Sequence, residues 1–178
     1  NMGTIGGNVC TASPAGDTLP PLYVLAAEVE LQHAGSRRRL PVREFITGPG
    51  QTRLAAGEIL TGIHIRKPVE ANCQRFEKIG QRRALACCIA SLAALLTLTP
   101  AGVVISARLA WGSVGPTVVE APAAEAALTG SVLSRDTLNR AAAFARQAVA
   151  PIDDIRASAA YRREVAGNLL LRLPQVQG

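Results

Sequence analysis

A glycine-rich segment near the start of the chain carries the residue types best suited to holding a ligand. It spans residues 3–8 and reads GTIGGN. Consecutive glycines let successive backbone N–H groups point into one concavity, where a phosphate or a ring carbonyl meets no Cβ atom. Asn8 tolerates a left-handed backbone, and its amide can donate and accept hydrogen bonds. A simple turn explains the same residues, so the surrounding sequence has to decide between the two.

Composition narrows the classes of function. The 178 residues carry a net charge of +6, and of the 19 basic residues only Lys67 and Lys78 are lysines. This balance suits nucleic acid, an anionic ligand or an acidic protein partner. Aromatic residues are only 3% of the chain, too few for the stacking platforms that bind single-stranded nucleic acid. We therefore expect no nucleic-acid partner.

The cysteines and the apolar segments indicate a compartment. The chain has four cysteines, Cys10, Cys73, Cys87 and Cys88. Their spacing fits neither a metal site nor a disulfide framework, so a reducing cytoplasm is the expected location. Residues 84–107 form the longest uncharged run, but Pro100 and Gly102 interrupt it, and we expect no membrane span. We also expect no signal peptide, because residues 1–4 lack a basic segment and an apolar segment.

The elements that would position a site follow from the residue patterns. In residues 1–68, Asp17 is predicted to cap a helix with Pro20-Pro21 in its first turn, continuing over residues 22–27. Alternating side chains predict strands at residues 28–32, 38–42 and 58–65. Strands before helices in each half predict an α+β fold rather than alternating βαβ units.

In the second half, a strand is predicted at residues 75–79. The uncharged run fits two buried strands, or a short helix and a strand, joined by a turn at residues 100–102. A helix over residues 123–128 should end at Gly130. Ser134 and Ser158 should cap two further helices. Their buried faces are predicted as Leu138, Ala142, Ala145 and Val149 on the first, and Tyr161, Val165 and Leu169 on the second.

The glycine-rich segment continues as TIGGNVCTASPAGD over residues 4–17. This stretch resembles the flavin-binding signature of the FAD subunit of molybdenum hydroxylases, the family of xanthine dehydrogenase and carbon monoxide dehydrogenase. Further blocks match that subunit in the same order: residues 58–60 (EIL), 76–83 (FEKIGQRR), 108–117 (RLAWGSVGPT) and 151–158 (PIDDIRAS). Several blocks in one order are far more specific than a single glycine loop.

The resemblance implies an organisation. Residues 1–68 would be the second α+β lobe of a two-lobe FAD-binding domain, and residues 72–175 an α+β sandwich C-terminal domain, with a boundary at 68–72. The family's first lobe, which holds the FAD pyrophosphate, is missing from this sequence, in agreement with its start at Asn1. The resemblance also implies an iron–sulfur subunit and a molybdenum-cofactor subunit as partners. The [2Fe-2S] clusters and the molybdenum cofactor are expected only there.

The resemblance further implies the residues that bind FAD: Thr4, Ile5, Gly6, Gly7, Asn8, Thr11, Asp17, Leu60 and Lys78. Thr11 should face the isoalloxazine or ribityl region, and Asp17 should accept a hydrogen bond from the ribityl chain or nearby backbone. Leu60 should pack on the ring. Lys78 should approach its polar edge, where a cation stabilises an anionic reduced flavin. The ring carries the redox chemistry, so no general acid, general base or metal ligand is expected in this chain.

Structural roles compete with these assignments. Asp17 suits a helix cap, Thr11 a loop hydroxyl, Leu60 a strand core and Lys78 a solvated strand position. His33 and His64 are read as surface residues without partners.

Three pairs of neighbouring residues bear on the electron acceptor and on metal binding. Arg82-Arg83 is either a solvated turn or part of a docking rim, and Asp153-Asp154 suits a turn or a cap better than a metal. Ala84-Leu85 stand where animal xanthine dehydrogenases place carboxylates near the NAD site, which puts NAD as acceptor in doubt.

Two main hypotheses result. In the first, the chain belongs to a flavoprotein subunit that passes electrons from iron–sulfur clusters through FAD to NAD or another acceptor. In the second, it is a scaffold or interaction module of the same complex and holds no flavin. A third, a basic nucleic-acid-binding domain, predicts binding that weakens steeply with salt.

Overall fold

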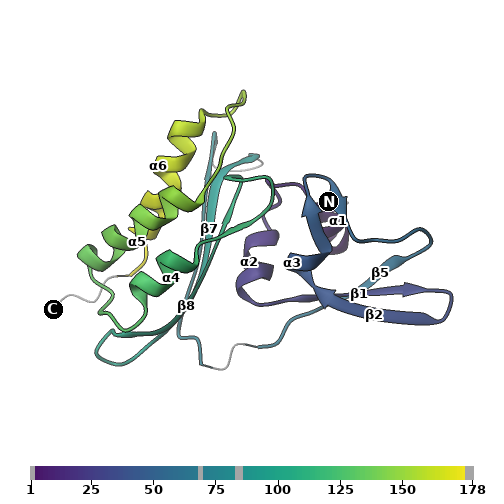
Figure 1. The fold of residues 1–178 in the computed structure, drawn as a ribbon, viewed down its shortest axis with the longest axis horizontal. Helices are drawn as coiled ribbons and strands as arrows, with labels where there is room; N and C mark the ends of the chain where they lie inside the picture. Colours follow the sequence, from purple (N-terminus) through teal and green to yellow (C-terminus); the bar gives the residue numbers. More distant parts are fainter. Residues whose placement is uncertain (1–2, 68–69, 83–85, 175–178) are drawn as a thin grey trace.

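A four-stranded antiparallel sheet forms the centre of the molecule (Figure 1). The computed structural model describes residues 3–67, 70–82 and 86–174. The sheet has the order β6-β7-β8-β9. Its strands are β6 (Cys73–Gly80), β7 (Cys88–Leu98), β8 (Val104–Gly112) and β9 (Val119–Glu120). Helices lie on both faces of this sheet, which explains why its central strands are so apolar.

Strand β7 is buried on both faces. Leu92 and Leu96 point into a core shared with the three C-terminal helices, whereas Ala93 and Leu95 belong to the core of the N-terminal lobe. The helices on the first face are α4 (Pro122–Leu128), α5 (Arg135–Ala148) and α6 (Ala159–Leu170). Helix α2 (Leu19–Val24) packs against β7 and β8 on the opposite face. The uncharged run of the sequence is therefore a strand between two cores.

The N-terminal lobe is built on a smaller antiparallel sheet of order β2-β1-β5. Its strands are β1 (Glu28–His33), β2 (Ser36–Pro41) and β5 (Ile59–His64). Val29 and Leu31 of β1 are fully buried against the lobe's helices. The lobe also contains α1 (Ile5–Thr11), α3 (Val42–Phe45), β3 (Ile46–Gly48) and β4 (Gln51–Thr52). Helix α1 lies against β5, which brings the two segments expected to touch a cofactor together.

The structure confirms the α+β prediction and several of its elements. The uncharged run forms two antiparallel strands, and Gly102, with φ of 75°, lies in the turn between them. Ser134 and Ser158 cap α5 and α6, accepting hydrogen bonds from the amides of Thr137 (3.3 Å) and Tyr161 (3.2 Å). Part of the predicted boundary at residues 68–72 lies outside the described residues.

Three predictions about helices were wrong. Asp17 does not cap α2: Thr18 occupies the cap position and makes no capping hydrogen bond through its side chain. The helix also ends at Val24 rather than near residue 27. On α6, Tyr161 is half exposed, and the buried face instead contains Arg162, which is only 1% exposed. The prediction left charged residues out of the core, but the guanidinium of Arg162 has polar partners inside the protein.

Those partners are two backbone carbonyls and a carboxylate. Nη1 of Arg162 donates to the carbonyls of Ile89 (2.8 Å) and Ser113 (3.1 Å), and Nη2 donates to Asp154 Oδ1 (2.6 Å). Hydrogen bonds of this kind are what make a buried arginine tolerable. Within the described ranges, no helix combines the length and the apolar character needed to cross a membrane.

Candidate functional site

The glycine-rich segment forms the start of helix α1 and not a loop. Thr4 is the N-cap: its Oγ1 accepts a hydrogen bond from the Gly7 amide at 3.0 Å, and its carbonyl accepts from the Asn8 amide. Asn8 lies inside the helix, so it does not use the left-handed backbone that asparagine tolerates. Threonine is a favourable cap, and it offsets the poor helix propensity of Gly6 and Gly7. The amides of Ile5 and Gly6 have no partner within the helix.

A small pocket lies between this helix start and strand β5. It has a volume of about 380 Å³ and is lined by Thr4, Ile5, Gly6, Leu60, Thr61, Gly62, Ile63 and Ile65. A Cβ atom placed on Gly6 would lie 3.6 Å from Leu60 Cδ2, so any larger side chain there would extend toward the leucine. Four of the predicted site residues thus meet at one pocket with a largely apolar wall.

Asn8 connects this pocket to the turn that carries Asp17. Its Oδ1 accepts a hydrogen bond from the hydroxyl of Thr18. A Cβ atom on Gly16 would lie only 3.1 Å from the same Oδ1, so the turn approaches Asn8 closely because residue 16 is glycine. Thr11 is exposed, and its hydroxyl donates to the Gly7 carbonyl at 2.8 Å. Asn8 is thus a bridge between helix and turn, whereas Thr11 bonds only within its own helix.

Asp17 and Lys78 form an ion pair across the two parts of the chain. Lys78 Nζ lies 2.5 Å from Asp17 Oδ2, and the lysine side chain is 26% exposed. The second carboxylate oxygen, Asp17 Oδ1, is buried and has no hydrogen-bond partner among the described residues. A buried acceptor without a donor is unfavourable, so this oxygen can accept a hydrogen bond that the described residues do not supply. Lys78 is accordingly not the solvated strand residue considered above.

The surroundings of this ion pair include residues that the sequence did not single out. The Cys88 thiol lies close enough for the charges of Asp17 and Lys78 to act on it, and burial raises its pKa, so it stays neutral. The Cys88 carbonyl accepts hydrogen bonds from Ser113 Oγ at 3.0 Å and Arg156 Nη1 at 3.3 Å. The family resemblance over residues 151–158 included Arg156 but gave it no role.

Other polar residues have structural partners. His64 Nε2 lies 3.1 Å from Glu30 Oε2, so the expectation that it lacks a partner was wrong. Asp153 Oδ1 accepts from the Ala159 amide at 2.6 Å, and Asp154 binds two arginines, in line with turn and cap roles. In the part of the chain that the structure describes, no group of three or more potential ligands is placed to hold a metal ion. All four cysteines are free thiols.

Arg83 and Ala84-Leu85, which bear on the acceptor, lie outside the described residues. A larger groove, of about 1210 Å³, is lined by charged residues of both signs, among them Arg66, Lys67 and Glu70. It contains none of the nine predicted site residues. The pocket at α1 and β5, with the Asp17–Lys78 pair, remains the candidate site.

Comparison with known proteins identifies the family. Residues 1–68 match the FAD binding domain in molybdopterin dehydrogenase, and residues 75–175 match the CO dehydrogenase flavoprotein C-terminal domain. The carbon monoxide dehydrogenase medium chain of Afipia carboxidovorans is 32% identical over 171 residues, covering 96% of this chain and 59% of the relative. The nicotinate dehydrogenase FAD-subunit of Eubacterium barkeri is 29% identical, covering 97% and 60%.

Solved structures show the same relationship. A cyanide-inactivated Cu,Mo-CO dehydrogenase matches with a TM-score of 0.89 and 32% identity, over 97% of this chain and 59% of that chain. Quinoline 2-oxidoreductase from Pseudomonas putida 86 matches with a TM-score of 0.90 and 26% identity, over the same shares of the two chains.

The chain therefore belongs to the family of FAD-binding subunits of molybdopterin dehydrogenases, whose cofactor is FAD. Its relatives are oxidoreductase components. The chain spans about three-fifths of the length of the relatives it matches.

Proposed function

We propose that this chain is part of the flavoprotein subunit of a molybdenum-containing hydroxylase. In this role it passes electrons from the iron–sulfur clusters of a sister subunit through FAD to NAD or another acceptor. Substrate oxidation belongs to a third subunit that carries the molybdenum cofactor. The observation that carries the proposal is the buried Oδ1 of Asp17, which lies beside Lys78 and has no hydrogen-bond partner among the described residues, in a chain with a family match over both of its halves.

The residues present fit a flavin. Thr4, Ile5, Gly6 and Leu60 border a pocket with an apolar wall, which suits a planar ring. The amides of Ile5 and Gly6, which have no partner within the helix, suit the polar atoms of such a ring. Asp17 Oδ1 can accept a hydrogen bond from a ribityl hydroxyl. Asn8 holds the helix and the Asp17 turn together, and Thr11 adds a hydroxyl to the same helix.

Lys78 has an electrostatic role in this proposal. When bound, FAD supplies the redox chemistry of the ring, and the protein adjusts the stability of its charge states. Lys78 holds a positive charge where the structure leaves it one-quarter exposed, and Asp17 fixes its position. A cation in that place favours negative charge on a neighbouring group. No residue of this chain has to donate or remove a proton for this role.

The scaffold hypothesis stays as the second candidate because the chain spans only about three-fifths of its relatives' length. If the remaining part of the relatives supplies the contacts that decide affinity, this part by itself would organise the complex without holding a flavin. Either role fits the reducing cytoplasm, the compartment that four free thiols favour.

Absorption spectroscopy separates the two candidates. The full-length subunit and the segment 1–178 are each incubated with FAD and desalted, and the visible spectrum is recorded. The flavoprotein proposal expects a full-length subunit that retains flavin absorbance. A colourless full-length subunit would refute it. A colourless segment beside a coloured full-length subunit would assign the decisive contacts to the rest of the protein.

A further inference from the structure

Thr18 stands at the N-cap of helix α2, but its hydroxyl makes no capping hydrogen bond. A cap side chain normally accepts a hydrogen bond from the amide of the second or third helical residue. In α2 these two residues are Pro20 and Pro21, and proline has no N–H group. The sequence at the start of the helix therefore leaves the Thr18 hydroxyl free for a different partner.

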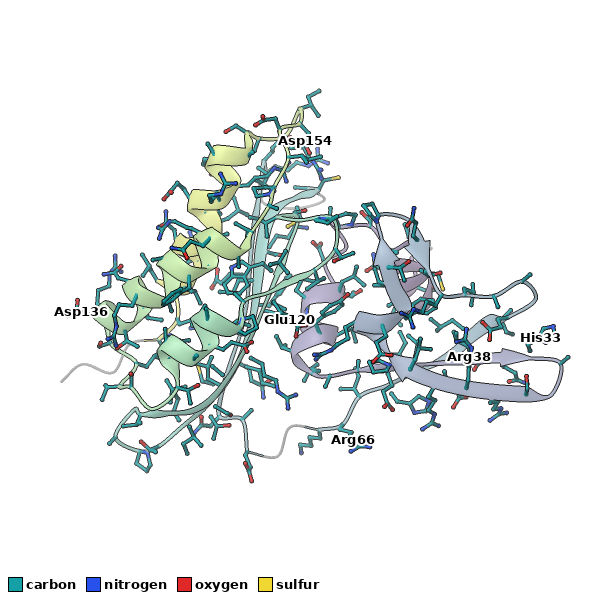
Figure 2. All side chains as sticks on the ribbon, in the orientation of Figure 1. His33, Arg38, Arg66, Glu120, Asp136 and Asp154 are labelled. Atoms are coloured by element: carbon teal, nitrogen blue, oxygen red, sulfur yellow. The ribbon has the colours of Figure 1, made fainter. Side chains whose placement is uncertain are left out.

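That partner is Asn8 of helix α1, whose Oδ1 accepts a hydrogen bond from the Thr18 hydroxyl. The bond joins two helices that pack on different parts of the molecule. Helix α1 lies against β5, whereas α2 packs against β7 and β8. Figure 2 shows side chains filling the space between α2 and the central sheet. Thr18 thus ties the helix of the candidate pocket to an element that is packed on the central sheet.

This hydrogen bond decides which atoms of Asn8 remain for a ligand. The backbone amide of Asn8 donates to the Thr4 carbonyl, and its Oδ1 is occupied by Thr18. The side-chain nitrogen Nδ2 makes no hydrogen bond to any residue in the described ranges. A side-chain amide carries one oxygen acceptor and one NH₂ donor group, so fixing the oxygen also fixes the direction of the donor. Asn8 is therefore held as a hydrogen-bond donor.

A second polar atom beside Thr18 also lacks a partner among the described residues. It is Asp17 Oδ1, which is buried, while the other oxygen of the same carboxylate binds Lys78. Asn8 follows Thr4, a residue of the pocket, by one turn of α1, which places both on the same side of the helix. Asn8 Nδ2 offers a donor and Asp17 Oδ1 an acceptor. FAD carries groups that complement both, in its carbonyl and phosphate oxygens and in its ribityl hydroxyls.

We propose that Thr18 is a positioning residue of the flavin site, because its hydroxyl holds Asn8 Oδ1 and so directs Asn8 Nδ2 to an acceptor oxygen of FAD. The inference rests on the proposed function, and it adds a residue that acts on the cofactor only through another. With the Asn8 amide oriented before FAD arrives, less conformational freedom is lost on binding. Without the Thr18 hydroxyl the amide can rotate, and its oxygen can then face an acceptor and repel it.

FAD affinity in variants of the full-length apoprotein tests the inference, measured by fluorescence titration. We expect Thr18→Val, which keeps the shape of the side chain but not its hydroxyl, to bind FAD about tenfold more weakly. Thr18→Ser keeps the hydroxyl and should stay within about twofold of the wild type. Thr129→Val is the matched control and should equal the wild type. Its exposed hydroxyl donates to the Glu125 carbonyl at 2.9 Å, and it does not line the pocket at α1 and β5.

Asn8→Asp separates the orientation of the amide from the link between the helices. An aspartate at this position still accepts from the Thr18 hydroxyl, so the link remains, but the Nδ2 donor is lost. We expect Asn8→Asp to bind FAD at least about tenfold more weakly than the wild type. Adding Thr18→Val to Asn8→Ala should weaken binding no further than Asn8→Ala alone, because Thr18 acts through Asn8.

The outcomes distinguish this inference from the function on which it rests. A wild-type subunit that binds no FAD would overturn the proposed function itself. Wild type that binds FAD, together with wild-type affinity in Thr18→Val or in Asn8→Asp, would overturn only the role of Thr18. Additive losses from Thr18→Val and Asn8→Ala would also overturn it, because Thr18 would then act independently of Asn8. Thermal unfolding is recorded for every variant, and if Thr18→Val is unstable, the affinity of Asn8→Asp decides.

Discussion

Lys78 on strand β6 lies with its Nζ 2.5 Å from Oδ2 of Asp17, a residue 61 positions earlier in the chain. The pair joins the central sheet to the turn that precedes α2. It leaves the other oxygen of Asp17 buried and without a donor among the described residues. A carboxylate held in this way by a lysine is oriented, charged and still able to accept one further hydrogen bond. The candidate flavin site is thus built from both halves of the chain.

Replacing Lys78 should change the energetics of the flavin more than the stability of the fold. In the full-length subunit, Lys78→Gln removes a positive charge beside the proposed position of the ring. The flavin midpoint potential should fall by roughly 30 mV, about 1.4 kcal/mol for a two-electron couple. A spectroelectrochemical titration measures this shift.

Lys67→Gln is the control, because Lys67 is the other lysine of the chain and lines the larger groove but not the pocket at α1 and β5. Its potential should equal that of the wild type. Equal potentials in all three proteins would place Lys78 away from the ring.

Arg162 and Arg163 are adjacent arginines with opposite environments, which makes them a matched pair. Arg162→Met should lower the free energy of unfolding by about 3 kcal/mol, because Asp154 and two backbone carbonyls lose their donor. Arg163→Met, at an exposed position, should change it by less than about 0.5 kcal/mol. Urea denaturation followed by the fluorescence of the buried Trp111 measures both values. Equal losses in the two variants would contradict the role given to Arg162.

Glu58 should make the N-terminal lobe sensitive to acid. Arg38 binds it with Nε and Nη2 at 2.6 and 2.7 Å, and the Ala55 amide adds a third hydrogen bond. These contacts lower the pKa of Glu58 from its ordinary value of 4.5 to about 2. A lowered pKa in the folded state means that the stabilisation is present above pH 4.5 and is lost as the pH falls toward 2.

Glu58→Gln should therefore show a shallower loss of stability over that pH interval than the wild type. Urea midpoints at a series of pH values give the two slopes. Parallel slopes would show that other carboxylates carry the acid sensitivity.

Elements that depend on local signals could be predicted from the sequence. The turn at residues 100–102, the caps at Ser134 and Ser158 and the antiparallel strands on either side of the turn are all present. Each rests on neighbouring residues: a glycine that accepts a positive φ, a hydroxyl that reaches an amide three residues ahead, or an apolar run long enough for a buried strand.

Features that depend on distant partners could not be predicted. The burial of Arg162 needs carbonyls from two other segments, and the pairing of His64 with Glu30 needs the register of β1 and β5. The glycine-rich segment is helical because Thr4 caps it, which outweighs the glycines' preference for irregular structure. Thr18, the partner of Asn8, carried no signal beyond its position beside Asp17. Gly62, which lines the pocket from within β5, did carry a sequence signal, because a glycine inside a strand often marks a close approach of a ligand or another backbone.

The central claim is that the pocket between α1 and β5 holds the flavin, and filling that pocket tests it most directly. Gly6→Val places a branched side chain toward Leu60, whereas Gly3→Val has nothing within 4 Å of its Cβ position. The dissociation constant for FAD is measured by fluorescence titration of each full-length apoprotein. We expect FAD to bind at least about tenfold more weakly to Gly6→Val, and Gly3→Val to match the wild type. Wild-type affinity in a correctly folded Gly6→Val subunit would contradict the account.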